Sequence, residues 1–137
     1  MKLATLGLAG MGYVLLAGAA LAHHSFAMFD TRVTVTLEGT VGGFLWTNPH
    51  SWITMNVENA QGEDEEWAIE MGGPAGLARS GWSATTLTPG MPVSVLIRPH
   101  RDGTRFGQFM AITLPDGTQL GNPEAPPSAD AGGLQPR

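Results

Sequence analysis

The sequence predicts an all-β domain with one short helix, folded as a five-stranded Greek-key barrel. Apolar and polar residues alternate with a period of two along most of the chain between residues 33 and 114, which is typical of strands with one buried face. One helical segment interrupts this pattern, and pairs containing glycine or proline mark the turns. The chain has 137 residues and no cysteine, so the fold has to be stable without disulfides.

Residues 1–22 are predicted to be a signal peptide. Lys2 precedes a run of about 20 apolar and small residues that ends in Ala20-Leu21-Ala22, the small-x-small pattern of a cleavage site. The run is also long enough for a retained membrane anchor. Its high content of glycine and alanine, and the lack of a basic cluster after it, favour cleavage instead. Cleavage predicts a periplasmic or secreted protein that has no membrane span and begins at His23.

The mature chain is long enough for one domain with a modest core, and it is acidic. Its formal net charge moves from −5 to −6, because the leader contains one of the seven cations and none of the twelve acids. The remaining cations are dispersed arginines rather than a basic patch, which argues against nucleic acid as a partner. Because thiolate is absent, a metal would have to bind through histidine, methionine, carboxylate or the terminal amine.

The first two strands are predicted to form a long, bent hairpin. The first strand starts near Val33 and is interrupted at Gly42-Gly43, as in a strand bent by a bulge. The second strand, about 51–58, points Ile53 to one face and Trp52 to the other. Such a bend suits a closed barrel.

A solvated turn and a third strand follow. Residues 59–66 include four consecutive acids. An acid run can bind calcium, but the alternating ligand spacing of a calcium loop is missing, so we interpret it as a solvated turn. The third strand points Trp67, Ile69 and Met71 inward and leaves Glu70 on the solvent side.

The second half of the chain predicts a helix and two strands. Pro74–Ser80 has room for two helical turns before Gly81. Strands follow at about 92–97, where Pro92 favours a strand start or an edge, and at 106–114. Residues 121–137 are rich in Pro, Ala, Gly and Ser and are predicted to be a disordered tail.

Three strands, a helix and two strands is the chain order of the OB-fold barrel, which we expect over residues 23–120. In that barrel the loop between strands one and two and the loop between strands four and five flank one binding face. Each of these loops contains one histidine, and none of the four histidines lies within a predicted strand. Imidazole is a common ligand for borderline metals, so we predict a metal site on this face. Its candidate ligands are His23, His24, His50 and His100.

Copper is the metal that this set fits best. A terminal histidine chelates through its amine and a ring nitrogen, and one further imidazole completes a three-nitrogen copper site. Thioethers also bind Cu(I), but methionine at alternating strand positions is more often core packing, and we assign the methionines to packing. Those methionines are Met28, Met55, Met71 and Met110. Each loop histidine also has a structural interpretation, as a side chain that hydrogen-bonds its own turn.

A metal-independent binding module is the alternative. In this interpretation an aromatic and cationic face takes a small ligand, haem included, or a protein partner in the periplasm. The residues of that face would be Trp46, Asn48, Trp52, Trp82 and Arg101. Catalysis has weaker support, because the sequence contains no nucleophile elbow, zinc-protease helix or phosphate-binding glycine loop. We therefore do not expect an enzyme, although oxidative copper chemistry stays open as a third hypothesis.

Several short motifs resemble a family of small secreted bacterial proteins described only as a domain of unknown function. The most specific motif is Trp46-Thr47-Asn48-Pro49-His50-Ser51. The others are His23-His24-Ser25-Phe26, Gly39-Thr40-Val41, Trp67-Ala68-Ile69-Glu70, Gly81-Trp82, Pro89-Gly90 and Arg101-Asp102-Gly103. The resemblance covers roughly residues 23–120 and implies a secreted β-rich domain, with no activity or ligand attached to it.

Overall fold

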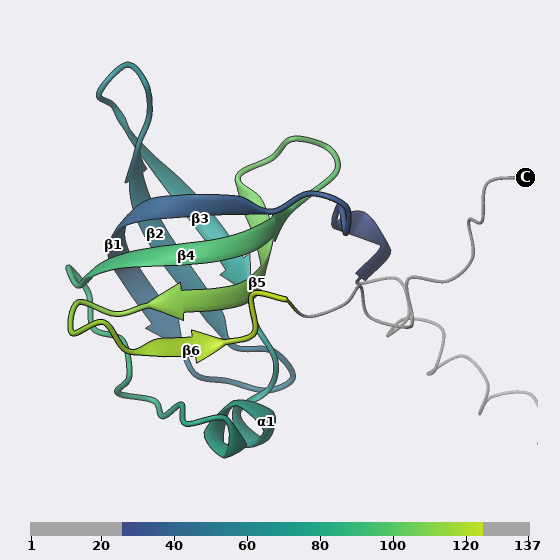
Figure 1. Cartoon of the computed structure of the whole chain (residues 1–137), viewed down its shortest axis with the longest axis vertical. Coiled ribbons are helices and arrows are strands. Elements are labelled where there is room, and N and C mark those ends of the chain that lie inside the picture. The colour runs from purple at the N-terminus through teal and green to yellow at the C-terminus, as the bar shows by residue number, and fades with distance from the viewer. Residues whose placement is uncertain (1–25, 125–137) are drawn as a thin grey trace, which may run out of the picture.

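Six strands and two short helices make up residues 26–124, the part of the chain that the computed structural model describes (Figure 1). In chain order they are η1 (Phe26–Met28), β1 (Val35–Leu45), β2 (Trp52–Glu58), β3 (Asp64–Glu70), α1 (Pro74–Arg79), β4 (Pro92–Pro99), β5 (Phe106–Thr113) and β6 (Gln119–Gly121). The predicted signal peptide, His23, His24 and most of the predicted tail lie outside these residues. No helix within residues 26–124 is long and apolar enough to cross a bilayer.

Five of the strands close into a barrel. The sheet order is β3-β2-β1-β4-β5-β6, and an additional parallel pairing of β3 with β5 joins the two sides. The resulting cycle, β1-β2-β3-β5-β4, is the strand arrangement of an OB-fold-like barrel, so the predicted fold class is confirmed. The short β6 was not predicted as a strand. It pairs with β5 and includes Gly121, the first residue of the predicted tail.

The long strand β1 bends so that its two halves pair with different neighbours. Residues 35–40 pair with β4 and residues 40–45 pair with β2. The register shifts between Val41 and Gly43, which confirms the predicted bulge. Gly39 allows the close approach of β2, because a Cβ there would collide with the carbonyl oxygen of Asn56. Val33 lies before β1 and is exposed, so the strand begins later than the sequence pattern indicated.

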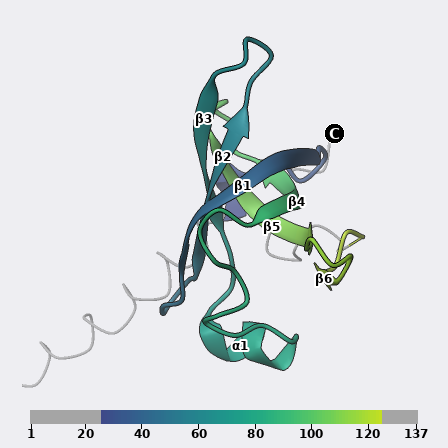
Figure 2. The ribbon, with the colours of Figure 1, turned by 90° about the vertical axis from the view of Figure 1, so that its left-hand side faces the viewer.

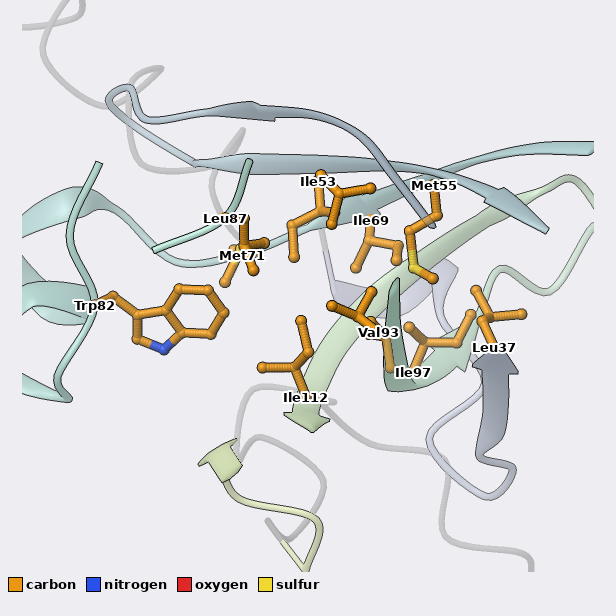
Figure 3. Packing of buried hydrophobic residues seen from close by; sticks show 12 residues of the cluster. Leu37, Ile53, Met55, Ile69, Met71, Trp82, Leu87, Val93, Ile97 and Ile112 are labelled. Carbon is orange, nitrogen blue, oxygen red and sulfur yellow. The ribbon is translucent and has the colours of Figure 1, made fainter. Parts of the chain in front are cut away.

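The core lies inside the barrel and is almost entirely aliphatic (Figure 3). Ile53, Met55 and Ile69 are completely buried, as the alternation predicted. Met71 and Met110 are buried as well, whereas Met28 is exposed, so the packing interpretation was wrong for that methionine. Met28 belongs to η1, which precedes the barrel strands, and the alternation rule does not apply there.

α1 lies beyond one end of the barrel, at the opposite end from the β2–β3 turn (Figures 1 and 2). The helix starts with Pro74 and contains no buried residue. It ends before Gly81, whose φ of 89° is in the left-handed region that favours glycine. The segment after α1 contributes Trp82 and Leu87 to the core, so this segment, rather than the helix itself, fills the end of the barrel.

Candidate functional site

A row of polar side chains crosses the outer face of the barrel where β3 and β5 meet. The strand register places Trp52 opposite Glu70, Glu70 opposite Gln108, and Gln108 opposite Arg98. Residues that are directly opposite in a sheet project to the same face. Their neighbours Ile53, Ile69 and Ile97 are buried in the core, so this row projects away from the core.

Both charged members of the row are buried. Glu70 is 8% exposed and Arg98 is 5% exposed, although both project from the outer side of the sheet. Charged groups lose strong hydration on burial and are rarely buried without partners. The sequence interpretation of Glu70 as a solvent-side acid was therefore wrong, since this carboxylate contacts His50 and is screened from water.

His50 and Glu70 form the central pair of the site. Nδ1 of His50 contacts Oε1 of Glu70, and the imidazole side chain stays 34% exposed. A carboxylate that is ionised only accepts hydrogen bonds, so with Glu70 in that form Nδ1 is the donor of this pair. Nε2 is then the nitrogen left for another partner.

The loop that carries His50, residues 46–51, is fixed against the start of α1. Its Asn48-Pro49 peptide bond is cis, and the carbonyl oxygen of Pro49 packs so closely on Gly73 that a Cβ there would lie 2.8 Å from it. Ser51 then continues the pairing next to β2, since its amide donates to the carbonyl of Gly72 at 3.0 Å. His50 is thus held between a packed turn and a hydrogen-bonded strand end.

A small cavity adjoins this pair where β3 separates from β5. Its volume is about 90 Å³. Its lining is polar at His50, Glu70 and Gln108 and apolar at Met71 and Phe109, with Gly72 between. A polar ligand group could reach His50 from this cavity while an apolar part packs on the other wall.

His100 lies in the second loop, residues 100–105, and has a carboxylate partner of its own. Its Nδ1 lies 2.5 Å from Oδ1 of Asp102. The carboxylate also accepts hydrogen bonds from the backbone amide of Thr104 at 2.9 Å and from its hydroxyl at 2.7 Å. These two bonds from Thr104, followed by the contact with His100, hold the pKa of Asp102 below its usual range, which favours the ionised carboxylate.

The segment before β1 packs against the same loop. Phe29 is completely buried and forms an isolated bridge with His100. Its ring lies 5.9 Å from the His100 ring and 5.2 Å from the Phe106 ring, and its carbonyl accepts a hydrogen bond from Nε of Arg101 at 3.0 Å. The amide of Arg101 donates to the carbonyl of Met28 at 2.8 Å. Residues 26–30 therefore reach the barrel beside His100.

The two loop histidines share one face, but within residues 26–124 each contacts its own carboxylate and neither contacts the other. The ring of Phe106 lies 5.6 Å from the His100 ring and stacks on Trp52 at 5.5 Å, with an interplanar angle of 19°. Trp52 is two residues from His50, so this aromatic pair lies on the face between the two loops. Among residues 26–124, no group of three or more histidine or acidic side chains is placed to hold a metal ion.

The remaining candidate ligand residues have different surroundings. Trp52 belongs to the outer row, whereas Trp46 is half-buried and packs edge-on against Phe44 at 5.7 Å. Asn48 is exposed beside Gly73. Trp82 is 4% exposed and packs in the core, so its indole does not lie on a binding face. The aromatic face is therefore made by Trp52 together with Phe106, which was not among the candidates.

A model of the family described as DUF6152, a family of unknown function, matches residues 12–109. No curated protein matches the chain, and no solved structure matches it.

Proposed function

We propose that this chain, which belongs to the DUF6152 family of unknown function, is a periplasmic or secreted metal-binding protein, with copper as its preferred ion. The proposed ligands are Nε2 of His50, Nε2 of His100 and the processed amino terminus at His23, with His24 next to it. The leader, residues 1–22, would direct export and then be removed. Binding rather than catalysis is the proposed activity.

The observation that carries this proposal is the carboxylate partner on each loop histidine. Nδ1 of His50 contacts Glu70, and Nδ1 of His100 contacts Asp102. Histidines that bind metals commonly direct their second nitrogen to a carboxylate, which fixes the ring and raises the basicity of the ligating nitrogen. Two such pairs on one face, in the only two histidines among the described residues, favour a ligand role over a packing role.

The amino terminus is needed because the described residues do not bring three ligands together. In a chain cleaved after Ala22, residues 23–25 would link the terminal amine to Phe26, and three residues of extended chain at roughly 3.5 Å each set a maximum reach of about 10 Å from the start of η1. η1 leads directly into Phe29, the residue that bridges His100. Within that reach, the amine and ring of His23 can approach the second loop and add two nitrogen donors to the imidazoles of His50 and His100.

The experiment is a Cu(II) competition titration on the metal-free mature chain that starts at His23. Mass spectrometry of the exported protein first establishes the cleavage site. We expect His100→Ala and His50→Ala each to lower the Cu(II) affinity by about tenfold or more, because each removes an imidazole ligand. A chain with one alanine added before His23 keeps every imidazole but displaces the amine, and it should lose affinity similarly.

Thr47→Ala is the matched control, since it changes the first loop without removing an imidazole. It should bind copper like the unaltered chain. Circular dichroism should show the same fold for all variants. Unchanged Cu(II) affinity in the His50→Ala, His100→Ala double variant would contradict the proposal.

A second candidate function is metal-independent binding of an aromatic ligand. The specific observation in its favour is the stacked pair of Trp52 and Phe106, two half-buried rings on the outer face between the two loops. A flat aromatic ligand, haem included, could stack against Trp52. Binding that survives a chelator and is lost in Trp52→Ala would favour this function over the metal site.

A further inference from the structure

The outer face of β2 changes in character along the strand. At its start, Trp52 lies opposite Leu45 of β1, whose side chain is 57% exposed. The indole of Trp52 stacks on Phe106 and stays half-buried. Thr54 and Asn56 follow on the same face, because side chains two residues apart in a strand project to the same side. This face therefore begins with apolar and aromatic side chains and continues with neutral polar ones.

The far end of the same face is acidic. The register places Asn56 opposite Glu66 and Glu58 opposite Asp64, and the three acidic residues are all exposed. Like charges that lie directly opposite each other in a sheet are destabilising. Within residues 26–124, no basic side chain forms an ion pair with these three carboxylates. A cationic ligand would relieve their repulsion.

The centre of the face can form hydrogen bonds with a ligand. Thr54 lies between Gly43 and Ala68 in the register, and a Cβ on Gly43 would be 3.2 Å from the hydroxyl oxygen of Thr54. The missing side chain of Gly43 therefore leaves room beside this hydroxyl. The side chains of Thr54 and Asn56 form no hydrogen bond within the described part of the chain. A hydroxyl and an amide can each donate and accept, so both suit the hydroxyl groups of a sugar.

We infer that this face binds a cationic oligosaccharide, a short chain of amino sugars. One sugar ring packs against the indole of Trp52, hydroxyl groups bond to Thr54 and Asn56, and ammonium groups lie at the acidic end. OB-fold barrels use the face of their second and third strands for oligosaccharides and oligonucleotides. The distance along β2 from Trp52 to Glu58 is roughly 20 Å, which matches about four sugar rings. The inference goes beyond the proposed metal function and does not depend on it.

Charge and geometry favour this ligand over two others. The carboxylates of the acidic end repel the phosphates of an oligonucleotide. An extended peptide gains much of its affinity from main-chain hydrogen bonds at the edge of a sheet, whereas this surface is the face of three paired strands. A neutral sugar would leave the repulsion at the acidic end uncompensated.

The experiment is calorimetric titration of the mature chain in the presence of EDTA, at a mildly acidic pH that keeps sugar amines protonated. The probe is the β-1,4-linked tetramer of glucosamine. Cellotetraose has the same linkage without the amines, and tetralysine has four amines without the sugar rings. We expect the glucosamine tetramer to bind at least tenfold more tightly than either comparison compound.

Single substitutions test the two ends and the centre of the face. Trp52→Ala should lower the affinity for the glucosamine tetramer about tenfold, because it removes the aromatic surface. Asn56→Ala should lower it a few-fold through the lost amide. Glu66→Gln should lower it about threefold, and this loss should shrink as salt screens the charge.

Glu124→Gln is the matched control for Glu66→Gln, since it removes an exposed carboxylate that lies after β6. It should bind the tetramer like the unaltered chain. If Trp52→Ala lowers the melting temperature, Asn56→Ala and Glu66→Gln decide the question, because both positions are exposed. Equal affinity for cellotetraose or for tetralysine, or no binding of the glucosamine tetramer, would overturn the inference. None of these results bears on copper binding, since EDTA is present and no proposed copper ligand is changed.

Discussion

The two histidine loops each place a carboxylate beside Nδ1 of the histidine, but they do so in different ways. The partner of His50 is Glu70, 20 positions further along the chain in another strand and 11% exposed in its side chain, so the pair exists only when the barrel is closed. The partner of His100 is Asp102, two residues away in the same turn and 53% exposed. The second loop instead depends on Phe29, which packs on it from outside the barrel. The first site is therefore formed by tertiary structure. The second is formed by a local turn together with residues 26–30, an arm that packs on this turn.

The largest loss of stability should come from removing the ring of Phe29, which anchors the arm to the second loop. Phe29→Ala deletes a completely buried ring between His100 and Phe106 and should lower the free energy of unfolding by about 3–5 kcal/mol. Urea denaturation measures this loss. Val33→Ala, at an exposed position just before β1, is the control and should change stability by less than about 0.5 kcal/mol. If the two variants were equally stable, Phe29 would not be an anchor of the second loop.

The second largest effect should distinguish the carboxylate of Glu70 from that of Asp102. Glu70→Gln removes the charge of a buried side chain and should cost about 1–3 kcal/mol of stability and about 10- to 100-fold in copper affinity. Asp102→Asn alters an exposed turn and should lower stability less than Glu70→Gln does. Thermal denaturation and copper titration of both variants test the comparison. Equal losses of stability would show that the first pair does not depend on the closed barrel more than the second.

The smallest effect should be a change in how the stability of the protein depends on acidic pH. Arg105 at the end of the second loop donates to Glu65 of β3 at 2.6 Å, and this bond, with one from Asn59, lowers the pKa of Glu65 to about 2. A depressed carboxylate pKa contributes stability above its ordinary value of 4.5, and this contribution is lost as the pH falls from there towards 2. Glu65→Gln should therefore make the melting temperature less sensitive to acid in that range.

Glu66→Gln, in the same strand, is the control for this acid effect. It removes an exposed carboxylate that neighbours Glu65 but does not make the bond to Arg105. An identical acid profile in the two variants would show that the contact between β3 and the second loop has no part in it.

The barrel could be predicted from the sequence because its signals are local. Alternation identified the inward residues Ile53 and Ile69, and Gly42-Gly43 marked the bulge. Whether an outward residue is buried depends on what packs over the sheet, and alternation does not contain that information. Glu70 was misjudged for this reason, and Trp82 was grouped with surface aromatics because an isolated tryptophan after a helix has no periodic pattern to place it.

The site was only partly predictable for a related reason. The motif around His50 and the turn at His100 stand out in the sequence, but their partners come from strand register and from the arm. The opposition of Trp52 and Glu70 follows from the β2–β3 register, which the turn between Glu58 and Asp64 sets, and the bridge from Phe29 to His100 follows from the path of residues 26–30. Neither of these two contacts can be predicted from the spacing of residues in the sequence alone.

Long-range ¹H–¹⁵N NMR of the imidazole measures whether Glu70 holds Nδ1 of His50 and leaves Nε2 for the metal. Cu(I) is diamagnetic, so the same spectrum can be recorded with and without metal. We expect added Cu(I) to shift the Nε2 resonance of His50 while Nδ1 keeps its proton. A metal-induced shift at Nδ1, or no shift at either nitrogen of His50, would contradict it.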